Sequence, residues 1–265
     1  MAKINYFGKT DSGLVRPNNE DTFLIKPGMG FCVVADGMGG AAAGELASRI
    51  FAETALDVFL RAEGRFETEI QGQTQITIEN SDDVTIIRSE TEIPKRVQTI
   101  FTLANKRILD HVKKTPQHKG MGCTAELIAF YDDNFVLGHL GDSRIYRIQN
   151  GKLKQLTKDH SLVQDQIDQG LISPEEARNH SLRNVITRAV GIDKRCNIDM
   201  LGGKISSGDL FLLCSDGLTD MVDDNLIYKV LSSSMDLSQK AEKLVEMANS
   251  AGGRDNVTVV LAEIL

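Results

Sequence analysis

The sequence lacks the features of several large protein classes. No stretch of the 265 residues approaches the roughly 18 consecutive apolar residues of a membrane helix, and the first residues contain no apolar signal-peptide core. An excess of positive charge is also lacking, because 37 acidic residues outnumber 30 lysines and arginines and give a formal net charge of -7 at pH 7. Without a basic stripe, the chain has little with which to neutralise a nucleic-acid backbone. We therefore expect a cytoplasmic protein with no membrane span and no nucleic-acid partner.

Closely spaced cysteines are absent as well. Cys32, Cys123, Cys196 and Cys214 stand far apart, with no C-x-x-C pair that would indicate zinc or redox chemistry. Cys32 and Cys214 lie inside apolar runs, so we expect them to be reduced core residues.

The composition is that of an ordinary globular protein, with 41% hydrophobic and 25% charged residues. The length fits one domain over residues 1–265. Apolar runs predict strands at 31–35, 125–131, 135–140, 210–214 and 257–262. Helices are predicted at 45–62, at 97–112 from the three- and four-residue apolar spacing, and at 238–249 with Ser238 as the N-cap.

Two regions interrupt this pattern. Residues 64–95 are polar and contain the turn-prone run Asn80-Ser-Asp-Asp83, which predicts an inserted surface hairpin. Residues 159–195 are rich in charged and amide side chains, and Ser173 with Pro174 has the pattern of a capped helix start. We expect a short helical flap in this second region and call residues 159–195 the flap.

Aspartates recur where apolar runs end. Asp36, Asp142 and Asp216 each follow a run, and Asp255 shortly precedes the strand at 257–262. In antiparallel pairing the start of one strand lies beside the end of its neighbour, so all four carboxylates can share one rim. Any one of these aspartates could simply belong to a turn. The whole set is better explained by a site.

Carboxylates gathered in this way repel one another and are costly to desolvate, so such a cluster needs cations. Oxygen ligands suit Mg²⁺ or Mn²⁺. Gly37, which follows Asp36, has no Cβ and would let its carbonyl approach a metal. Arg16 precedes the acidic cluster Asn19-Glu-Asp21 and could hold a phosphate by two charge-assisted bonds, although a lone arginine is more often a solvated surface charge.

With these segments identified, the chain resembles the metal-dependent protein phosphatase family, the protein phosphatase 2C type, in its bacterial form. Eight motifs occur in the family's order: Thr10-Asp-Ser-Gly-Leu-Val-Arg16 with Asn19-Glu-Asp21, Val34-Ala-Asp-Gly-Met-Gly-Gly40, Gly122-Cys-Thr-Ala125, Gly138-His-Leu-Gly-Asp-Ser-Arg144, Leu156-Thr-Lys-Asp-His-Ser161, Ile186-Thr-Arg-Ala-Val-Gly191, Cys214-Ser-Asp-Gly-Leu218 and Gly253-Arg-Asp-Asn-Val-Thr258.

The resemblance implies an α+β fold, a four-layer α-β-β-α sandwich of two antiparallel sheets flanked by helices, with a binuclear metal centre at one end. It implies that two Mn²⁺ or Mg²⁺ ions are held there. Asp36 would bridge them and be a catalytic residue, the Gly37 carbonyl, Asp216 and Asp255 would be direct ligands, and Asp21 would act through water. Asp142 would help to bind a third, weaker ion, and Arg16 would be the catalytic, phosphate-binding arginine.

The implied reaction is hydrolysis of phosphoserine and phosphothreonine in proteins by a metal-bridging water, without a phospho-enzyme, counteracting a serine/threonine kinase. We expect a monomer. Met38 departs from the family, because many eukaryotic members have there a histidine proposed as the general acid. The proton could come from metal-bound water instead. His139 and His160 could substitute for it, but histidines in such positions are more often structural.

The 64–95 insertion is a second departure. It can be a solvated decoration, which surface loops tolerate well, or a docking hairpin. Other phosphatase types are disfavoured, since no cysteine is followed six residues later by arginine and neither D-x-D nor G-D-x-H-G occurs. A relaxed substrate range, or action on a sigma-factor regulator, stays open. A degenerate, catalytically inactive phosphoprotein-binding module is a further alternative, which the presence of Asp36, Asp216 and Asp255 disfavours.

Overall fold

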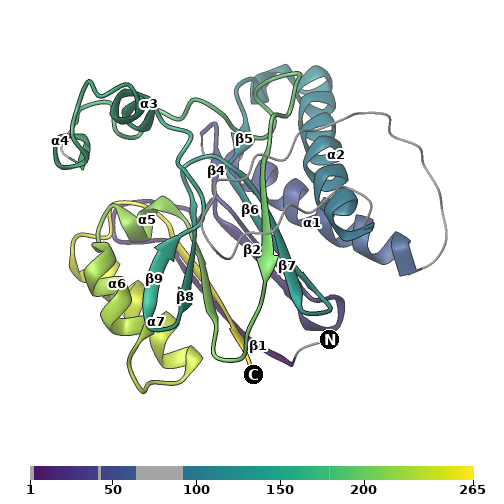
Figure 1. The fold of residues 1–265 in the computed structure, drawn as a ribbon. Helices are drawn as coiled ribbons and strands as arrows, with labels where there is room; N and C mark the ends of the chain where they lie inside the picture. The colour runs from purple at the N-terminus through teal and green to yellow at the C-terminus, as the bar shows by residue number, and fades with distance from the viewer. Residues whose placement is uncertain (1–2, 41–42, 64–91, 179) are drawn as a thin grey trace.

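The protein is built from two antiparallel β-sheets packed face to face, with helices on both outer faces (Figure 1). The computed structural model describes residues 3–40, 43–63, 92–178 and 180–265. Within these ranges one five-stranded sheet has the order β1-β12-β11-β8-β9, the other has the order β10-β7-β6-β3-β2, and β4 pairs with β5. The predicted four-layer α-β-β-α sandwich is therefore confirmed.

The strands are β1 (Ile4–Asp11), β2 (Thr22–Lys26), β3 (Phe31–Ala35), β4 (Gly37–Met38), β5 (Gly122–Cys123), β6 (Ala125–Tyr131), β7 (Asn134–Leu140), β8 (Arg144–Gln149), β9 (Lys152–Gln155), β10 (Asp199–Lys204), β11 (Leu210–Cys214) and β12 (Val257–Ile264). The helices are α1 (Ala43–Glu63), α2 (Glu92–Lys114), α3 (Leu162–Asp168), α4 (Pro174–Arg178), α5 (Asp216–Thr219), α6 (Asp224–Leu231) and α7 (Leu237–Ser250), with 3-10 turns η1 (Pro27–Met29) and η2 (Pro116–His118).

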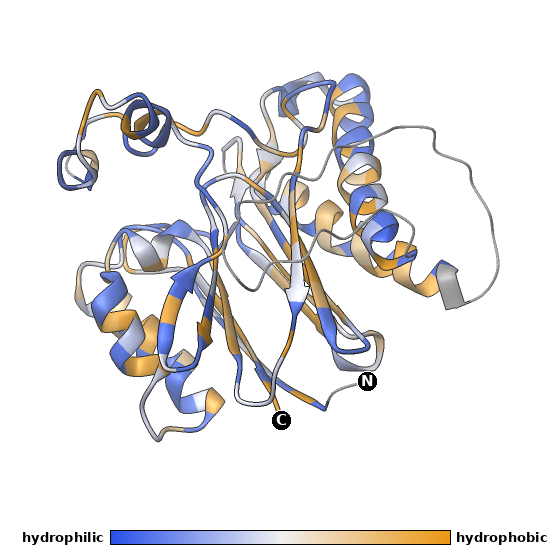
Figure 2. Cartoon of the chain, viewed as in Figure 1, coloured by the Kyte–Doolittle hydropathy of each residue, from blue (hydrophilic) through white to orange (hydrophobic). Residues whose placement is uncertain are grey.

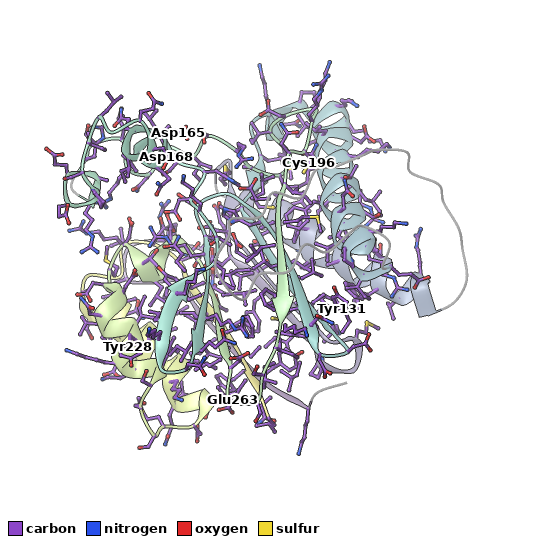
Figure 3. All side chains as sticks on the ribbon, viewed as in Figure 1. Tyr131, Asp165, Asp168, Cys196, Tyr228 and Glu263 are labelled. Carbon is purple, nitrogen blue, oxygen red and sulfur yellow. The ribbon has the colours of Figure 1, made fainter. Side chains whose placement is uncertain are left out.

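The side chains of each strand alternate between the two faces of its sheet, and this produces three layers of hydrophobic core. In β11, Leu212 faces the α5–α7 side, whereas Phe211 and Leu213 face the opposite sheet. In β3, Val33 packs with helices α1 and α2, whereas Val34 lies between the sheets. Successive side chains of a strand point to opposite faces, so strands buried on both faces are apolar throughout. Figure 2 shows apolar residues on the sheets and on the helix faces turned toward them, and Figure 3 shows side chains filling the sandwich.

Several sequence predictions are confirmed. The structure has strands at all five predicted positions, and the predicted cysteines Cys32 and Cys214 are fully buried. The predicted cap Ser173 is also confirmed, because its hydroxyl accepts the Glu176 N–H at 3.2 Å while the Glu176 carboxylate accepts the Ser173 N–H at 2.7 Å. Two short helices, α3 and α4, lie within the flap and project from the sandwich in Figure 1.

Two boundaries were predicted wrongly. Ser238 is not the N-cap of the last helix: Asp236 caps α7, and its side chain forms a reciprocal capping box with Gln239. Ser238 lies inside the first turn of α7, where its hydroxyl donates to the Asp236 carboxylate instead of capping the helix. The predicted 64–95 hairpin also extends too far, since α2 begins at Glu92 with an i,i+4 pair between Glu92 and Arg96. Residues 64–91 lie outside the described residues.

Among the described residues, no helix has both the length and the apolar character that crossing a bilayer requires. The start of β1 pairs with the end of β12, at the end of the sandwich opposite the flap (Figure 1).

Candidate metal and phosphate site

The predicted rim is formed by both sheets at one end of the sandwich. Asp36 follows β3 and Asp142 follows β7; because both strands run antiparallel to β6, they end at the same edge. Asp216 follows β11 in the other sheet, and Asp255 precedes the antiparallel β12. The Ser215 N–H donates to the Thr258 carbonyl at 3.1 Å, which holds these two chain segments together. The structure thus brings together the four aspartates that the sequence predicted to share a rim.

These carboxylates border a cavity of about 390 Å³. Its lining includes the predicted residues Arg16, Asp36, Gly37, Asp142, Asp216 and Asp255, together with Glu20, Met38 and Asn256. Asp21 is buried and is not among the lining residues. Its Oδ2 accepts hydrogen bonds from the Ser215 hydroxyl at 2.8 Å and the Thr258 hydroxyl at 2.7 Å.

Burial and mutual repulsion dominate the electrostatics of the rim. Desolvation, followed by the charges of neighbouring aspartates, holds the pKa of Asp36 and that of Asp216 well above the usual range. Desolvation raises the pKa of Asp142 to about 7, with Asp159 adding to the effect. For Asp21, desolvation raises the pKa to about 6, although the hydrogen bonds from Thr258 and Ser215 oppose it. Without cations, this cluster is electrostatically unfavourable.

The oxygens of the rim fit hard divalent cations. Asp21 Oδ1, Asp142 Oδ1 and Asp216 Oδ1 are buried and have no hydrogen-bond partner. Buried polar atoms are normally satisfied, so three unpartnered carboxylate oxygens at one end of the fold indicate ligands for something else. Within the described residues, no three carboxylate, imidazole or thiol groups are arranged to chelate one ion unaided. Mg²⁺ does not require such a cage, because it retains several waters and binds through one or two carboxylates.

Gly37 is held where no side chain fits. A Cβ at this position would lie 2.2 Å from the Gly44 carbonyl oxygen and 2.7 Å from that of Glu20. The Gly37 N–H donates to the same Glu20 carbonyl at 3.2 Å, and β4 pairs with β5. The backbone after Asp36 is therefore fixed at the cavity wall, where a glycine is required.

Arg16 lies beside the carboxylates, as predicted, and is bonded to one of them. Its Nη2 donates to Asp255 Oδ2 at 2.7 Å. This hydrogen bond is the main cause of a raised pKa for Arg16. The Arg16 side chain is still 54% exposed, and within the described part of the chain only one hydrogen bond, from Nη2 to Asp255, engages its five N–H donors.

Comparison with known proteins identifies the family. Residues 16–263 match the sequence family described as protein phosphatase 2C. The chain belongs to this family. Among curated relatives of the 2C family, the serine/threonine phosphatase stp of Listeria welshimeri is 35% identical over 258 residues, which is 96% of this chain and 94% of that protein. The phosphatase PstP of Mycobacterium tuberculosis is 35% identical over 263 residues, or 99% of this chain and 45% of that protein.

Solved structures agree with this membership. The phosphatase PstP/Ppp of M. tuberculosis superposes with a TM-score of 0.83 at 33% identity, covering 98% of both chains. The catalytic domain of PstP, solved in complex with two manganese ions, has a TM-score of 0.81 at 32% identity, covering 99% of this chain and 98% of that one. PppA of Pseudomonas aeruginosa has a TM-score of 0.80 at 29% identity, covering all of this chain and 99% of that one. These are bacterial proteins, as the motifs predicted.

Neither His139 nor His160 is placed to act as an acid in the 2C-type site. Met38 lines the cavity but carries no proton donor. His139 is 1% exposed and bonds Glu126 at 2.5 Å and the Lys158 carbonyl at 2.7 Å. His160 is 5% exposed, accepts from the Gly141 N–H and bonds Asp199, and burial lowers its pKa to about 4. All four ring nitrogens have protein partners, which agrees with the structural interpretation of both residues.

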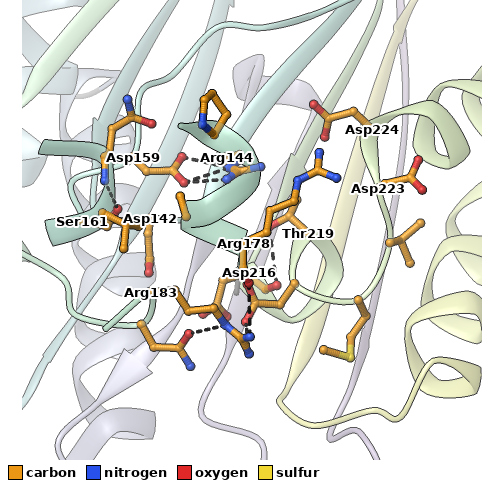
Figure 4. A pocket seen from close by; sticks show the side chains of 18 of the residues that line it. Asp142, Arg144, Asp159, Ser161, Arg178, Arg183, Asp216, Thr219, Asp223 and Asp224 are labelled. Carbon is orange, nitrogen blue, oxygen red and sulfur yellow. Dashed lines mark hydrogen bonds and ion pairs between the residues drawn. The ribbon is translucent and has the colours of Figure 1, made fainter. Parts of the chain in front are cut away.

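Part of the site was not predicted from the sequence. Glu20 borders the cavity beside Arg16, and its carboxylate occupies the space over Gly44 at the start of α1. Its position between Asn19 and Asp21, inside the acidic cluster, was the sequence feature that could have predicted it. A second cavity of about 560 Å³ shares Asp142 and Asp216 with the first and extends beneath the flap. Figure 4 shows a partly buried ion pair in its wall, in which Arg144 binds Asp159 through two nitrogens.

Proposed function

We propose that this 2C-type protein is a metal-dependent protein-serine/threonine phosphatase that removes phosphate from phosphoserine and phosphothreonine side chains. The observation that supports this most strongly is the buried carboxylate rim, with three unpartnered oxygens, beside a half-exposed arginine. The relatives named serine/threonine phosphatases, and the manganese complex of one of them, support the same assignment.

Each rim residue has a proposed role. Asp36, the Gly37 carbonyl, Asp216 and Asp255 would hold two Mn²⁺ or Mg²⁺ ions, with Asp21 acting through water. Asp142, whose Oδ1 has no partner, would contribute to a third, weaker site. When bound, two such ions lower the pKa of a shared water and neutralise phosphoryl oxygens.

The protein side chains themselves bind and orient the substrate. Arg16 receives the phosphate, because its planar guanidinium offers several donors and only one is used by Asp255. Its bond to Asp255 fixes the guanidinium next to the rim, where the phosphoryl group would lie. No side-chain nucleophile is needed for hydrolysis by water. Met38, in the cavity wall, has no proton to donate to the leaving alkoxide.

The wider context is also part of the proposal. We infer that residues 1–265 are one phosphatase domain, that the protein acts as a monomer in the cytoplasm, and that a serine/threonine kinase produces its phosphoprotein substrates. The shared cavity under the flap, next to Asp142 and Asp216, offers room for the polypeptide around the phosphorylated residue.

The decisive experiment measures hydrolysis of an aryl phosphate and of a phosphothreonine peptide. Activity is expected with Mn²⁺ or Mg²⁺, to be abolished by a chelator, and to be lost in Asp36→Asn and Asp216→Asn. Full activity in the chelator or in either variant would overturn the assignment. An inactive wild type that still binds the phosphopeptide would instead establish the degenerate binding module.

A further inference from the structure

Asn256 stands directly after the predicted ligand Asp255, and its side chain is fully hydrogen-bonded. It is 5% exposed. Its Oδ1 accepts the Glu20 N–H at 2.8 Å, and its Nδ2 donates to the Ser12 carbonyl at 3.0 Å and the Asn18 carbonyl at 2.8 Å. One acceptor and both donors of the amide are thus used by three backbone groups.

All three backbone groups belong to one loop. Residues 12–20 lie between β1 and β2 and include Arg16. Because this loop has no regular backbone hydrogen bonding of its own, its shape depends on such contacts. The Leu14 N–H and Val15 N–H donate to the Gly253 carbonyl at 2.7 and 3.2 Å, so the chain just before Asn256 holds the same loop.

Asn256 is itself anchored to the rigid part of the fold. A Cβ on Gly217 would lie 1.9 Å from the Asn256 carbonyl oxygen, so the two backbones touch at the start of α5. The Asn256 N–H also donates to Asp255 Oδ1 at 2.9 Å. The residue therefore contacts the Arg16 loop, the Asp216 helix and the Asp255 carboxylate at once.

We propose that Asn256 is a positioning residue that holds loop 12–20 in the shape that brings Arg16 to the phosphate. Although it lines the cavity, its side-chain amide is occupied by loop backbone groups, so it acts through Arg16. The inference rests on the proposed function, because it assumes that Arg16 binds the phosphate. The alternative is that Asn256 only satisfies buried polar groups and contributes stability alone.

The test uses Asn256→Asp, which keeps the shape of the side chain. The change replaces both donors with oxygen, which would face the carbonyls of Ser12 and Asn18. The control is Asn150→Asp, the same change of charge at an exposed turn between β8 and β9. Amide hydrogen exchange is expected to accelerate at Leu14 and Glu20 in Asn256→Asp and not in the control, while the amides of β11 and β12 stay protected. Asn256→Ala serves if the aspartate variant does not fold.

Inhibition by inorganic phosphate, measured with saturating Mn²⁺, reports the phosphate site. We expect the inhibition constant and KM to rise about tenfold in Asn256→Asp, the scale of a lost charge-assisted contact, with a smaller change in kcat. In an Arg16→Ala background the same substitution should add less than about twofold, because the two act as one unit.

An unchanged inhibition constant in Asn256→Asp, or a full effect that persists without Arg16, would overturn the inference. Both results presuppose an active wild-type enzyme, so they are distinct from failure of the proposed function, in which the wild type itself would not hydrolyse phosphate esters. Loss of protection in β11 and β12 in both Asn256 variants would show a structural role and would also overturn it.

Discussion

The hydroxyl of Thr258 donates a 2.7 Å hydrogen bond to Asp21 Oδ2. Thr258 is fully buried and also bonds Thr10 on the neighbouring strand at 2.7 Å. The bond leaves the other oxygen of Asp21, Oδ1, without a partner. Thr258 thus orients the Asp21 carboxylate through Oδ2 and leaves Oδ1 available to a ligand.

From this contact we predict that Thr258→Val weakens binding of divalent cations by roughly tenfold to a hundredfold, as loss of an outer-shell partner typically does. Calorimetric titration of the metal-free protein with Mn²⁺ measures the affinity directly. Thr102→Val, on the exposed face of α2, is the control and should bind normally. Equal affinity in the two variants would mean that Thr258 does not orient the site.

A second prediction concerns the stability of the metal-free protein. In the folded state the pKa of Asp142 is about 7, compared with 3.8 for an ordinary aspartate, so the folded protein binds more protons across this window. The contribution of Asp142 to stability must therefore fall as the pH rises from about 4 to about 7. Asp21, with a pKa near 6, acts in the same direction. The lowered pKa of His160 acts in the opposite direction below its usual value of 6.5, because there the unfolded chain binds more protons.

Comparison with Asp142→Asn isolates the aspartate effect, since His160 is common to both proteins. In chelator, the melting temperature of the variant relative to wild type should be higher at roughly pH 8 than at roughly pH 5. A difference that does not depend on pH would contradict the raised pKa of Asp142. With Mn²⁺ present at high pH, the wild type should have the higher melting temperature of the two, because it then gains a cation that the variant binds less well.

A third prediction tests the tight backbone at Gly37. Gly37→Ala would place a Cβ 2.2 Å from the Gly44 carbonyl oxygen, so it should cost about 1–3 kcal/mol, as overpacking does. The control is Gly28→Ala, where a Cβ meets nothing within 4 Å. Urea unfolding in chelator measures both. If Gly37→Ala were as stable as Gly28→Ala, the backbone there would have room to relax.

A fourth prediction addresses the insertion. Removal of residues 66–90 leaves the start of α2 at Glu92 intact, so catalytic activity on an aryl phosphate should be unchanged. For a solvated decoration, which we expect, activity on a whole phosphoprotein is unchanged as well. A loss confined to the phosphoprotein would establish a docking role instead.

The sequence predicted the strands whose side chains are buried on both faces. β3 and β11 consist of apolar residues throughout, which makes them visible without knowledge of their neighbours. β9, by contrast, is a half-exposed edge strand of sequence Lys-Leu-Lys-Gln, and its pairing with β8 depends on a turn and on tertiary contacts. Such strands have no strong local signal.

The same distinction applies to the site. Asp36, Asp142 and Asp216 could be grouped because strand ends imply a shared rim. The bond between Arg16 and Asp255 joins residues 239 positions apart, and the buried pair of Glu126 and His139 joins neighbouring strands. Partner choice of this kind follows from strand register and side-chain direction, which no linear pattern specifies.

Because each sheet supplies part of the rim, a cation bound there would cross-link the two sheets of the sandwich. Its binding energy would then be lost only when the sheets part, so metal would protect the whole fold cooperatively instead of stiffening one loop. Removal of the metal would correspondingly destabilise both sheets together. The enzyme would then lose its activity and this cross-link between the sheets at the same time.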